Sequence, residues 1–345
     1  MSQVSGQPRI VALGGGHGLA ATLTALRQLT SELTAIVTVA DDGGSSGQIR
    51  RELDVLPPGD LRMALAAMAG TDLKHRDMAT LLQHRFGGSG VLAGHPVGNL
   101  LLTGLAEVFE GDTVRALATM GELVGAVGRV LPMSTIPLEI TAWVDPPDST
   151  GDDPIGDDPN ARTLIRGQVA VATTPGRVRS VQLVPESPPA CLPAVDAIDA
   201  ADVVVLGPGS WFTSVLPHVL VPELLNALER SSARVVVVLN LEPQAGETEG
   251  FSPQEHLRVL REHAPRLPVH TVLADAARVV DRRGLLNAVH ALQVEGRAEP
   301  RLVLRPVARA TAPADGDQHD PRLLAVALEY VITSARRTEE QPAWP

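Results

Sequence analysis

The stretch RIVALGGGHG, residues 9–18, decides the fold, because a short apolar run leads directly into a cluster of glycines. Residues 9–13 are typical of a buried strand, and residues 19–29 (LAATLTALRQL) have the apolar spacing of a helix. Strand, glycine turn and helix in this order begin a nucleotide-binding α/β fold, in which the helix N-terminus receives a phosphate. The candidate ligand-binding residues of this loop are Gly14, Gly15, Gly16, His17 and Gly18.

The glycine spacing does not single out NAD as the ligand. Gly14 and Gly16 match the first two glycines of the dinucleotide fingerprint, but Leu19 stands where the third is needed. The acid at the end of the second expected strand, Asp41, lies 27 positions after Gly14, whereas the fingerprint places it about 20 positions on. The loop therefore predicts some phosphate-bearing ligand, and a tight turn without a ligand remains the alternative.

The strand-and-helix pattern recurs along the chain. Apolar runs at 35–40 (AIVTVA), 201–206 (ADVVVL) and 233–240 (ARVVVVLN) are typical of parallel strands buried on both faces. They predict an α/β protein with a doubly wound, mostly parallel, Rossmann-like sheet. We expect a single domain over residues 9–336 with short tails at 1–8 and 337–345.

The middle of the chain predicts a different arrangement. Residues 138–144 (LEITAWV), 162–172 (RTLIRGQVAVA) and 178–184 (VRSVQLV) are typical of antiparallel strands. The turn sequence TTPGR at 173–177 predicts a hairpin between the last two, inserted in the parallel architecture. Residues 145–161 are nearly devoid of apolar side chains and predict an acidic surface loop, not a calcium loop.

The sequence DDGGSSG, residues 41–47, follows the second expected strand and is interpreted as a Gly/Ser loop. Its acids lie where open α/β sheets bind ligands, so they could hold a ribose hydroxyl or Mg²⁺, or act as a general base. Turn formation or capping is the structural alternative. Ser45 also fits the G-x-S-x-G pattern of esterases, but two aspartates separate it from the strand. The candidates are Asp41, Asp42, Gly43, Gly44, Ser45 and Ser46, of which Asp41 and Asp42 are the catalytic and Mg²⁺ candidates.

A third candidate loop, GPGSWFTS at residues 207–214, follows another buried strand. Its glycines admit a ligand and its hydroxyls offer donors, although a capped helix start would explain the same residues. The candidates are Gly207, Gly209, Ser210, Thr213 and Ser214. Asn99, at the start of an expected helix, is a further candidate, whereas His95 is interpreted as a loop residue. Asp60 is expected to be the N-cap of the helix that follows PPGD.

Composition narrows the function classes. The chain has 345 residues with 29 basic and 40 acidic side chains, and this net charge of −11 argues against a nucleic-acid-binding protein. Cys191 is the only cysteine, which excludes an internal disulfide and a cysteine-based zinc site. No signal peptide or membrane-spanning run is evident, so we expect a cytoplasmic protein with no membrane partner. We further expect a homo-oligomer.

Taken together, eight motifs resemble the YvcK/CofD-like family, and in particular its YvcK branch, the gluconeogenesis factors. They occur in the family's order and span about residues 9–335. The motifs are VALGGGHGL (11–19), IVTVADDGGSSGQIRREL (36–53), PPGDLR (57–62), GHPVGNLLLTGL (94–105), GRVLPMS (128–134), LGPGSWFTSVLPHVLVP (206–222), QAGETEGFS (244–252) and HDP (319–321).

The resemblance implies a Rossmann-like core that binds a UDP-sugar, typically UDP-N-acetylglucosamine. It also implies a regulatory role in cell shape and in envelope precursor supply during gluconeogenic growth, with a kinase or a cell-envelope enzyme as partner. The sister branch, CofD, implies instead a Mg²⁺-dependent transferase that moves a phospholactyl group from a guanylated donor onto a deazaflavin in coenzyme F420 synthesis. In either branch, Gly14 to Gly18, Asp41, Asp42 and Gly207 to Ser210 fall in the nucleotide cleft.

The form of the DDGGSSG loop favours the regulator over the transferase. Some positions depart from the family's pattern: members commonly have Thr at His17 and Asn at Met63, and Pro and Tyr at Ala245 and Phe251. An Arg-His-Asp run of the family, whose Arg is linked to nucleotide-sugar binding, is here 318–320 (QHD). The loss of that guanidinium removes a bidentate phosphate donor.

Overall fold

The computed structural model describes residues 6–146, 162–244, 246–309 and 318–339. Its largest element is a seven-stranded sheet in which every neighbouring pair of strands is parallel. The strand order is β10-β9-β8-β7-β1-β2-β3. This arrangement confirms the predicted doubly wound fold. Its strands are β1 (Ile10–Gly14), β2 (Leu33–Val37), β3 (Arg129–Pro132), β7 (Val203–Leu206), β8 (Arg234–Val238), β9 (Val269–Asp275) and β10 (Arg301–Arg305).

The strand order reverses between β1 and β7. From β1 the chain proceeds outward through β2 to β3, and from β7 it proceeds the opposite way through β8 and β9 to β10. Open α/β sheets bind ligands at such a switch point, beyond the carboxyl ends of the strands. The two expected glycine loops follow β1 and β7, so the fold brings both to this point.

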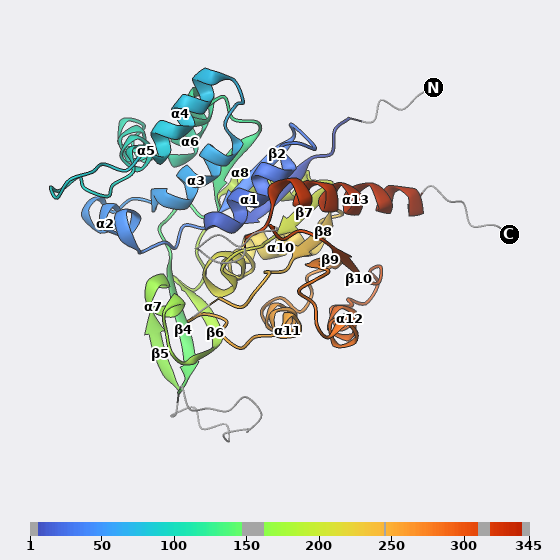
Figure 1. Cartoon of the computed structure of the whole chain (residues 1–345). Coiled ribbons are helices and arrows are strands. Elements are labelled where there is room, and N and C mark those ends of the chain that lie inside the picture. The colour runs from blue at the N-terminus through green and yellow to red at the C-terminus, as the bar shows by residue number, and fades with distance from the viewer. Residues whose placement is uncertain (1–5, 147–161, 245, 310–317, 340–345) are drawn as a thin grey trace.

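Helices cover both faces of the sheet (Figure 1). Helix α13 packs on α1 at one face, while α8 packs with α10 and α11 with α12. Every residue of β1 is buried, as expected for a sheet covered on both sides. The helices are α1 (Gly16–Leu26), α2 (Gly44–Leu53), α3 (Pro58–Met68), α4 (Leu73–Gln83), α5 (Val97–Val108), α6 (Thr113–Leu123), α7 (Gln168–Ala172), α8 (Leu192–Asp199), α9 (Pro217–Leu220), α10 (Pro222–Arg230), α11 (Pro253–His263), α12 (Arg282–His290) and α13 (Pro321–Glu339), with a π-helical turn at Trp211–Val215.

A second sheet is antiparallel, as predicted, but its pairing differs from the expected hairpin. It consists of β4 (Glu139–Asp145), β5 (Thr163–Arg166) and β6 (Arg177–Val184), and β4 lies in the centre with β5 and β6 on either side. The run expected to continue β5 forms α7 instead. Gly167, at φ 95°, ends the strand, and the carboxylate of Asp42 accepts the amide hydrogen of Val169 in the first turn of α7.

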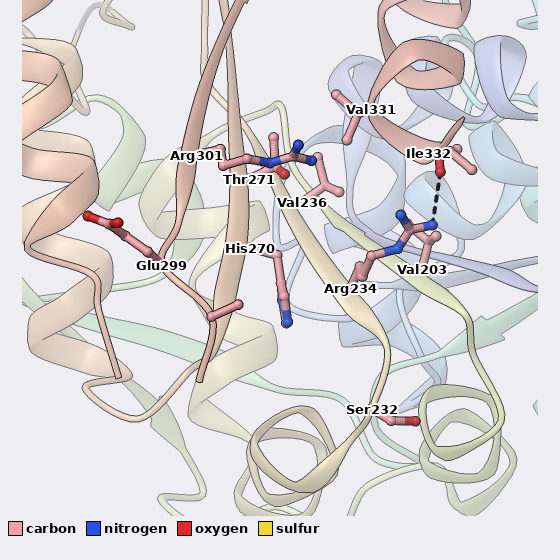
Figure 2. Close-up of a pocket in the computed structure, with 11 residues that line it drawn as sticks. Val203, Ser232, Arg234, Val236, His270, Thr271, Glu299, Arg301, Val331 and Ile332 are labelled. Carbon is pink, nitrogen blue, oxygen red and sulfur yellow. Dashed lines mark hydrogen bonds between the residues drawn. The ribbon is translucent and has the colours of Figure 1, made fainter. Parts of the chain in front are cut away.

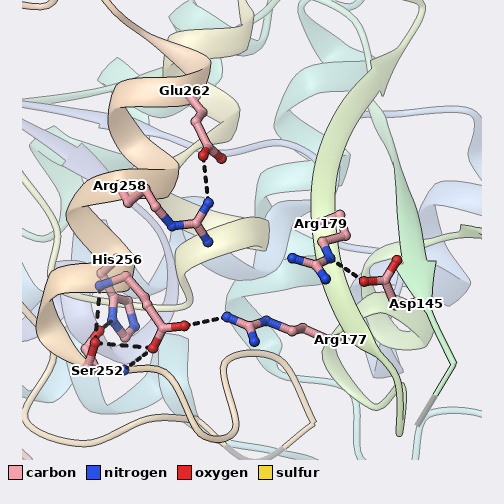
Figure 3. Close-up of polar contacts among 8 residues, drawn as sticks. Asp145, Arg177, Arg179, Ser252, His256, Arg258 and Glu262 are labelled. Carbon is pink, nitrogen blue, oxygen red and sulfur yellow. Dashed lines mark hydrogen bonds and ion pairs between the residues drawn. The ribbon is translucent and has the colours of Figure 1, made fainter. Parts of the chain in front are cut away.

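One salt bridge joins this second sheet to the main body, and another lies within the sheet (Figure 3). Arg177 of β6 pairs with Glu255 of α11, and Glu255 also forms a capping box with Ser252. Arg179 pairs with Asp145 at the end of β4. Most of the predicted acidic loop, residues 147–161, lies outside the described residues.

Two local predictions were wrong. The segment GGSSG forms the start of α2 and not a loop, with Gly43 as N-cap and the Gly47 amide donating to the Gly43 carbonyl at 2.8 Å. Asp60 is not an N-cap, because Pro57 takes that position and Pro58 begins α3. Within the described residues, no helix is both long and apolar enough to cross a bilayer.

Candidate functional site

The two glycine loops touch at the switch point. A Cβ placed on Gly18 would lie 2.2 Å from the Pro208 carbonyl oxygen and 2.7 Å from the Cα of Gly209. Side chains do not fit at such distances, so a glycine at position 18 is what allows the loops to meet. The side chain of Asn240, just after β8, fixes Gly209 by hydrogen bonds to its amide (2.9 Å) and its carbonyl (2.8 Å).

The first loop presents the N-terminus of α1. Gly15 is the N-cap and supplies no capping side chain. Gly16 adopts φ +57°, and a Cβ there would meet only open space, while His17 is exposed. Helix amides at such an end carry a partial positive charge, which suits a phosphate.

An acidic pair borders this loop, and it is not the pair that the sequence suggested. Asp60 accepts a hydrogen bond from the Gly16 amide. The Asp41 charge, together with burial as the larger cause, raises the pKa of Asp60 to about 7. Asp42 turns away toward α7, where it accepts from Val169 at 3.0 Å. The carboxylates of the cleft are therefore Asp41 and Asp60.

Burial likewise raises the pKa of Asp41, although hydrogen bonds from Gly43 and Ser46 oppose that shift. The Gly43 amide lies 3.0 Å from the Asp41 carboxylate. Two neighbouring carboxylates with water are a common arrangement for Mg²⁺. Among the described residues, no group of three or more His, Cys, Asp or Glu side chains is arranged to hold a metal ion. Any cation would thus depend on this pair and on the ligand itself.

A polar cluster lies next to the acids, at the start of α2. Ser45 Oγ is 2.8 Å from Nδ1 of His95 and accepts from Nδ2 of Asn99 at 3.0 Å. His95 and Asn99 are both buried. His95 is therefore part of this cluster and not the simple loop residue that the sequence suggested. Its position four residues before Asn99 in GHPVGN was the available signal.

Two polar atoms near this cluster lack a partner among the described residues: Oδ1 of Asn99 and Nε of Arg62. Arg62 is almost fully buried and donates to Gln83 Oε1 at 2.6 Å. Burial, followed by the charge of Arg85, lowers the pKa of Arg62 to about 10, so the side chain is still a cation at neutral pH. Buried polar groups are normally satisfied, so each of these two atoms calls for an explanation.

The second loop is closed by the protein's own carboxylate. Glu247, which is buried, accepts hydrogen bonds from the amides of Phe212 (2.8 Å) and Thr213 (2.9 Å). The Ser210 hydroxyl donates to Glu247 at 2.6 Å and also contacts the Thr213 hydroxyl. Ser210 and Thr213 thus already have an anionic partner, which the sequence did not reveal.

The remaining candidates divide between the two loops. Ser214 faces the first loop, since its Oγ would lie 3.2 Å from a Cβ on Gly15. Gly207, at φ +75°, packs against the Val238 carbonyl and so shapes the second loop. Ser46 is buried beside Asp41, and Gly44 is exposed at the start of α2.

Known proteins resemble this chain over most of its length. A family model described as 2-phospho-L-lactate transferase CofD matches residues 10–298. A "Putative gluconeogenesis factor" of Mycobacterium tuberculosis is 55% identical, with 96% of this chain and 93% of that protein covered. A "Gluconeogenesis factor" of Halalkalibacterium halodurans is 35% identical, with 85% and 84% covered. A crystal structure of a Bacillus halodurans protein superposes with a TM-score of 0.80 at 30% identity and covers 94% of this chain and 99% of that one. These matches confirm the resemblance drawn from the motifs: the chain belongs to the CofD family, among relatives named gluconeogenesis factors.

Proposed function

We propose that this protein binds a nucleotide-sugar of the UDP-N-acetylglucosamine type and acts as a regulator of cell shape and envelope precursor supply during gluconeogenic growth. The observation that carries the binding proposal is the N-terminus of α1 at the switch point, where Gly15 supplies no capping side chain and Asp41 and Asp60 lie close by. The relatives named gluconeogenesis factors support the physiological role. A kinase or a cell-envelope enzyme is the proposed partner, with a homo-oligomer as the working form.

The diphosphate, the ribose and the sugar of such a ligand each have a matching group at the switch point. The α1 amides and the free space at Gly16 suit the diphosphate. Asp41 suits ribose hydroxyls, directly or through Mg²⁺ held with Asp60. The Ser45–His95–Asn99 cluster offers hydrogen bonds to a sugar.

The test is binding by calorimetry and thermal shift with UDP-N-acetylglucosamine, GDP and NAD. At 100 times the dissociation constant, ligand binding contributes about 2.7 kcal/mol, which raises the melting temperature by several degrees. Asp41→Asn should weaken the UDP-sugar by about 1–3 kcal/mol. The matched control is Asp54→Asn, at an exposed position. A clear response to NAD or GDP and none to millimolar UDP-sugar would contradict the proposal.

A phospholactyl transferase of the CofD type is the second candidate. The Asp41–Asp60 pair favours it, because a carboxyl group with a pKa of about 7 is suited to exchange a proton near neutral pH. The assay uses a guanylated phospholactyl donor, Mg²⁺ and a deazaflavin. Turnover by the parent protein that falls by a factor of about 10² in Asp60→Asn would establish an enzyme. Weakened UDP-sugar binding in Asp41→Asn, with no parental turnover, supports the regulator.

A further inference from the structure

A cavity of about 360 Å³ lies at the amino ends of the main-sheet strands, whereas the glycine loops lie at their carboxyl ends. The strands contribute residues from their amino ends: Val203 begins β7, Arg234 begins β8, and Arg301 begins β10. Val331 and Ile332 of α13 complete the wall (Figure 2). This volume falls within the range of small-molecule sites, about 300–1,000 Å³.

Two guanidinium groups reach into the space beneath α13. Figure 2 shows Arg234 and Arg301 both extending toward that helix from neighbouring parts of the sheet edge. Arg234 donates to the Ile332 carbonyl at 3.0 Å. The wall also contains one acid, Glu299, but Figure 2 shows its carboxylate directed away from both guanidinium groups. Glu299 lies 3.7 Å from His290 instead.

The pKa of the His270 imidazole is sensitive to the charges around the cavity. Its Nδ1 accepts the Val235 amide at 3.1 Å, where the pairing of β8 with β9 shifts register. Burial lowers the pKa of His270, and the charges of Arg297, Arg234 and Arg301 lower it further. Three positive charges thus act on one partly buried ring, in a chain whose overall charge is −11.

An anchor for α13 alone would account for Arg234 but not for the rest of the cavity. Arg301 points into the same space from two strands away, and Val203, Val236 and Val331 add an apolar wall. Cationic groups above an apolar wall match a compact organic anion, because guanidinium groups bind carboxylates and phosphates in a fixed geometry.

We propose that this cavity binds a small carboxylate- or phosphate-bearing metabolite through Arg234 and Arg301. It is separate from the nucleotide-sugar site and does not depend on it. The volume of about 360 Å³ suits a small ligand.

The experiment is calorimetry on the full chain with citrate and, separately, inorganic phosphate at constant ionic strength. The two probes separate a carboxylate site from a phosphate site. We expect at least one probe to bind, and Arg301→Gln to weaken it at least tenfold, with partial recovery in Arg301→Lys. Arg283→Gln, an exposed arginine on α12, is the matched control and should stay within twofold of the parent.

Arg301 is the residue to change because Arg234 also holds α13, so that its loss would perturb the fold. Three outcomes would overturn the proposal: no binding of either probe, unchanged affinity in Arg301→Gln, or equal weakening in Arg283→Gln. The last would show charge attraction by the surface and not a site. Neither nucleotide nor sugar enters the measurement, so a failure here leaves the UDP-sugar proposal intact, and the reverse also holds.

Discussion

The two glycine loops at the switch point look alike in sequence but differ in which groups accept hydrogen bonds from their amides and hydroxyls. In the loop after β1, the Asp60 carboxyl group accepts one backbone hydrogen bond, from the Gly16 amide, and a Cβ on Gly16 would meet open space. The loop after β7 is filled by the Glu247 carboxylate, which binds its amides and hydroxyls. Glycine content alone therefore does not distinguish a ligand site from an internally satisfied turn.

The difference assigns separate roles to the loops. An amide that already donates to a buried carboxylate has little to offer a phosphate, so the second loop acts as a rigid wall against which the first is positioned. Elsewhere, Asp72, Asp112 and Asp281 cap α4, α6 and α12 with their own side chains, whereas α8 and α10 begin without a side-chain cap. The lack of a capping side chain at α1 is therefore shared with other helices, and what sets α1 apart is its place at the switch point beside Asp41 and Asp60.

Glu247→Ala tests this contrast most strongly. The change leaves the buried donors of Ser210, Phe212 and Thr213 without an acceptor, and we expect a loss of about 5 kcal/mol in the free energy of unfolding. Denaturant unfolding measures it. Glu249→Ala, at an exposed position two residues on, is the control and should change stability by under about 0.5 kcal/mol. A loss below about 1 kcal/mol for Glu247→Ala would show that the second loop is not held by its carboxylate.

The pH dependence of the stability of Asp60→Asn tests the charge state of Asp60 beside the first loop. The unfolded chain ionises near 3.8 while the folded Asp60 keeps its proton until about 7, so the parent should lose stability as pH rises between those values. The full difference corresponds to about 4 kcal/mol. We expect Asp60→Asn to match the parent at pH 4 and to be more stable than it at pH 8, as measured by unfolding at both values. A difference that is constant with pH would refute the raised pKa.

Alanine at two glycines of the same loop sharpens the comparison further. Gly18→Ala forces a Cβ against the Pro208 carbonyl and should cost about 3 kcal/mol. Gly16→Ala only strains a left-handed backbone with open space around it, at about 1 kcal/mol. Thermal unfolding of both variants measures the order. Equal costs would mean that the two loops do not meet as closely as described.

Ser45→Ala should have a small effect on stability, similar to that of Gly16→Ala. It removes one hydroxyl that pairs with His95 and Asn99, and we expect a cost of about 1 kcal/mol, with Ser89→Ala, an exposed serine, as the control. The same variant should weaken UDP-sugar binding if the cluster receives the sugar. A cost near that of Glu247→Ala would instead make this cluster a structural element like the second loop.

The sequence predicted the sheet well because its signals are local. Each of the buried runs that became β1, β7 and β8 is a continuous apolar stretch, and the glycines of the first loop directly follow β1. Long-range contacts were missed. Glu247 lies 37 residues from Ser210, and Asp42 caps a helix 127 residues away. The expected strand over 162–172 became α7 in part because of that distant cap.

The candidate site was predicted in part for the same reason. The cluster around Asp41 was found because DDGGSSG is compact, but its true neighbour, Asp60, was interpreted as a cap from the prolines before it. His95 joins Ser45 across 50 residues of chain, a contact that no spacing rule predicts. Site residues were thus predictable where they lie together in one short motif. They were not predictable where only the fold brings distant residues together.

The contact of Gly18 with Pro208 and Gly209 has a consequence for how a ligand enters and leaves. Because backbone meets backbone there, the two halves of the sheet cannot hinge apart at the switch point. Opening of the site must instead involve its outer wall. This wall consists of the helices α2 to α6, which lie between β2 and β3 in the chain. Exchange of the proposed ligand would then depend on that helical wall, while the backbone contact at Gly18 holds the floor of the site in place.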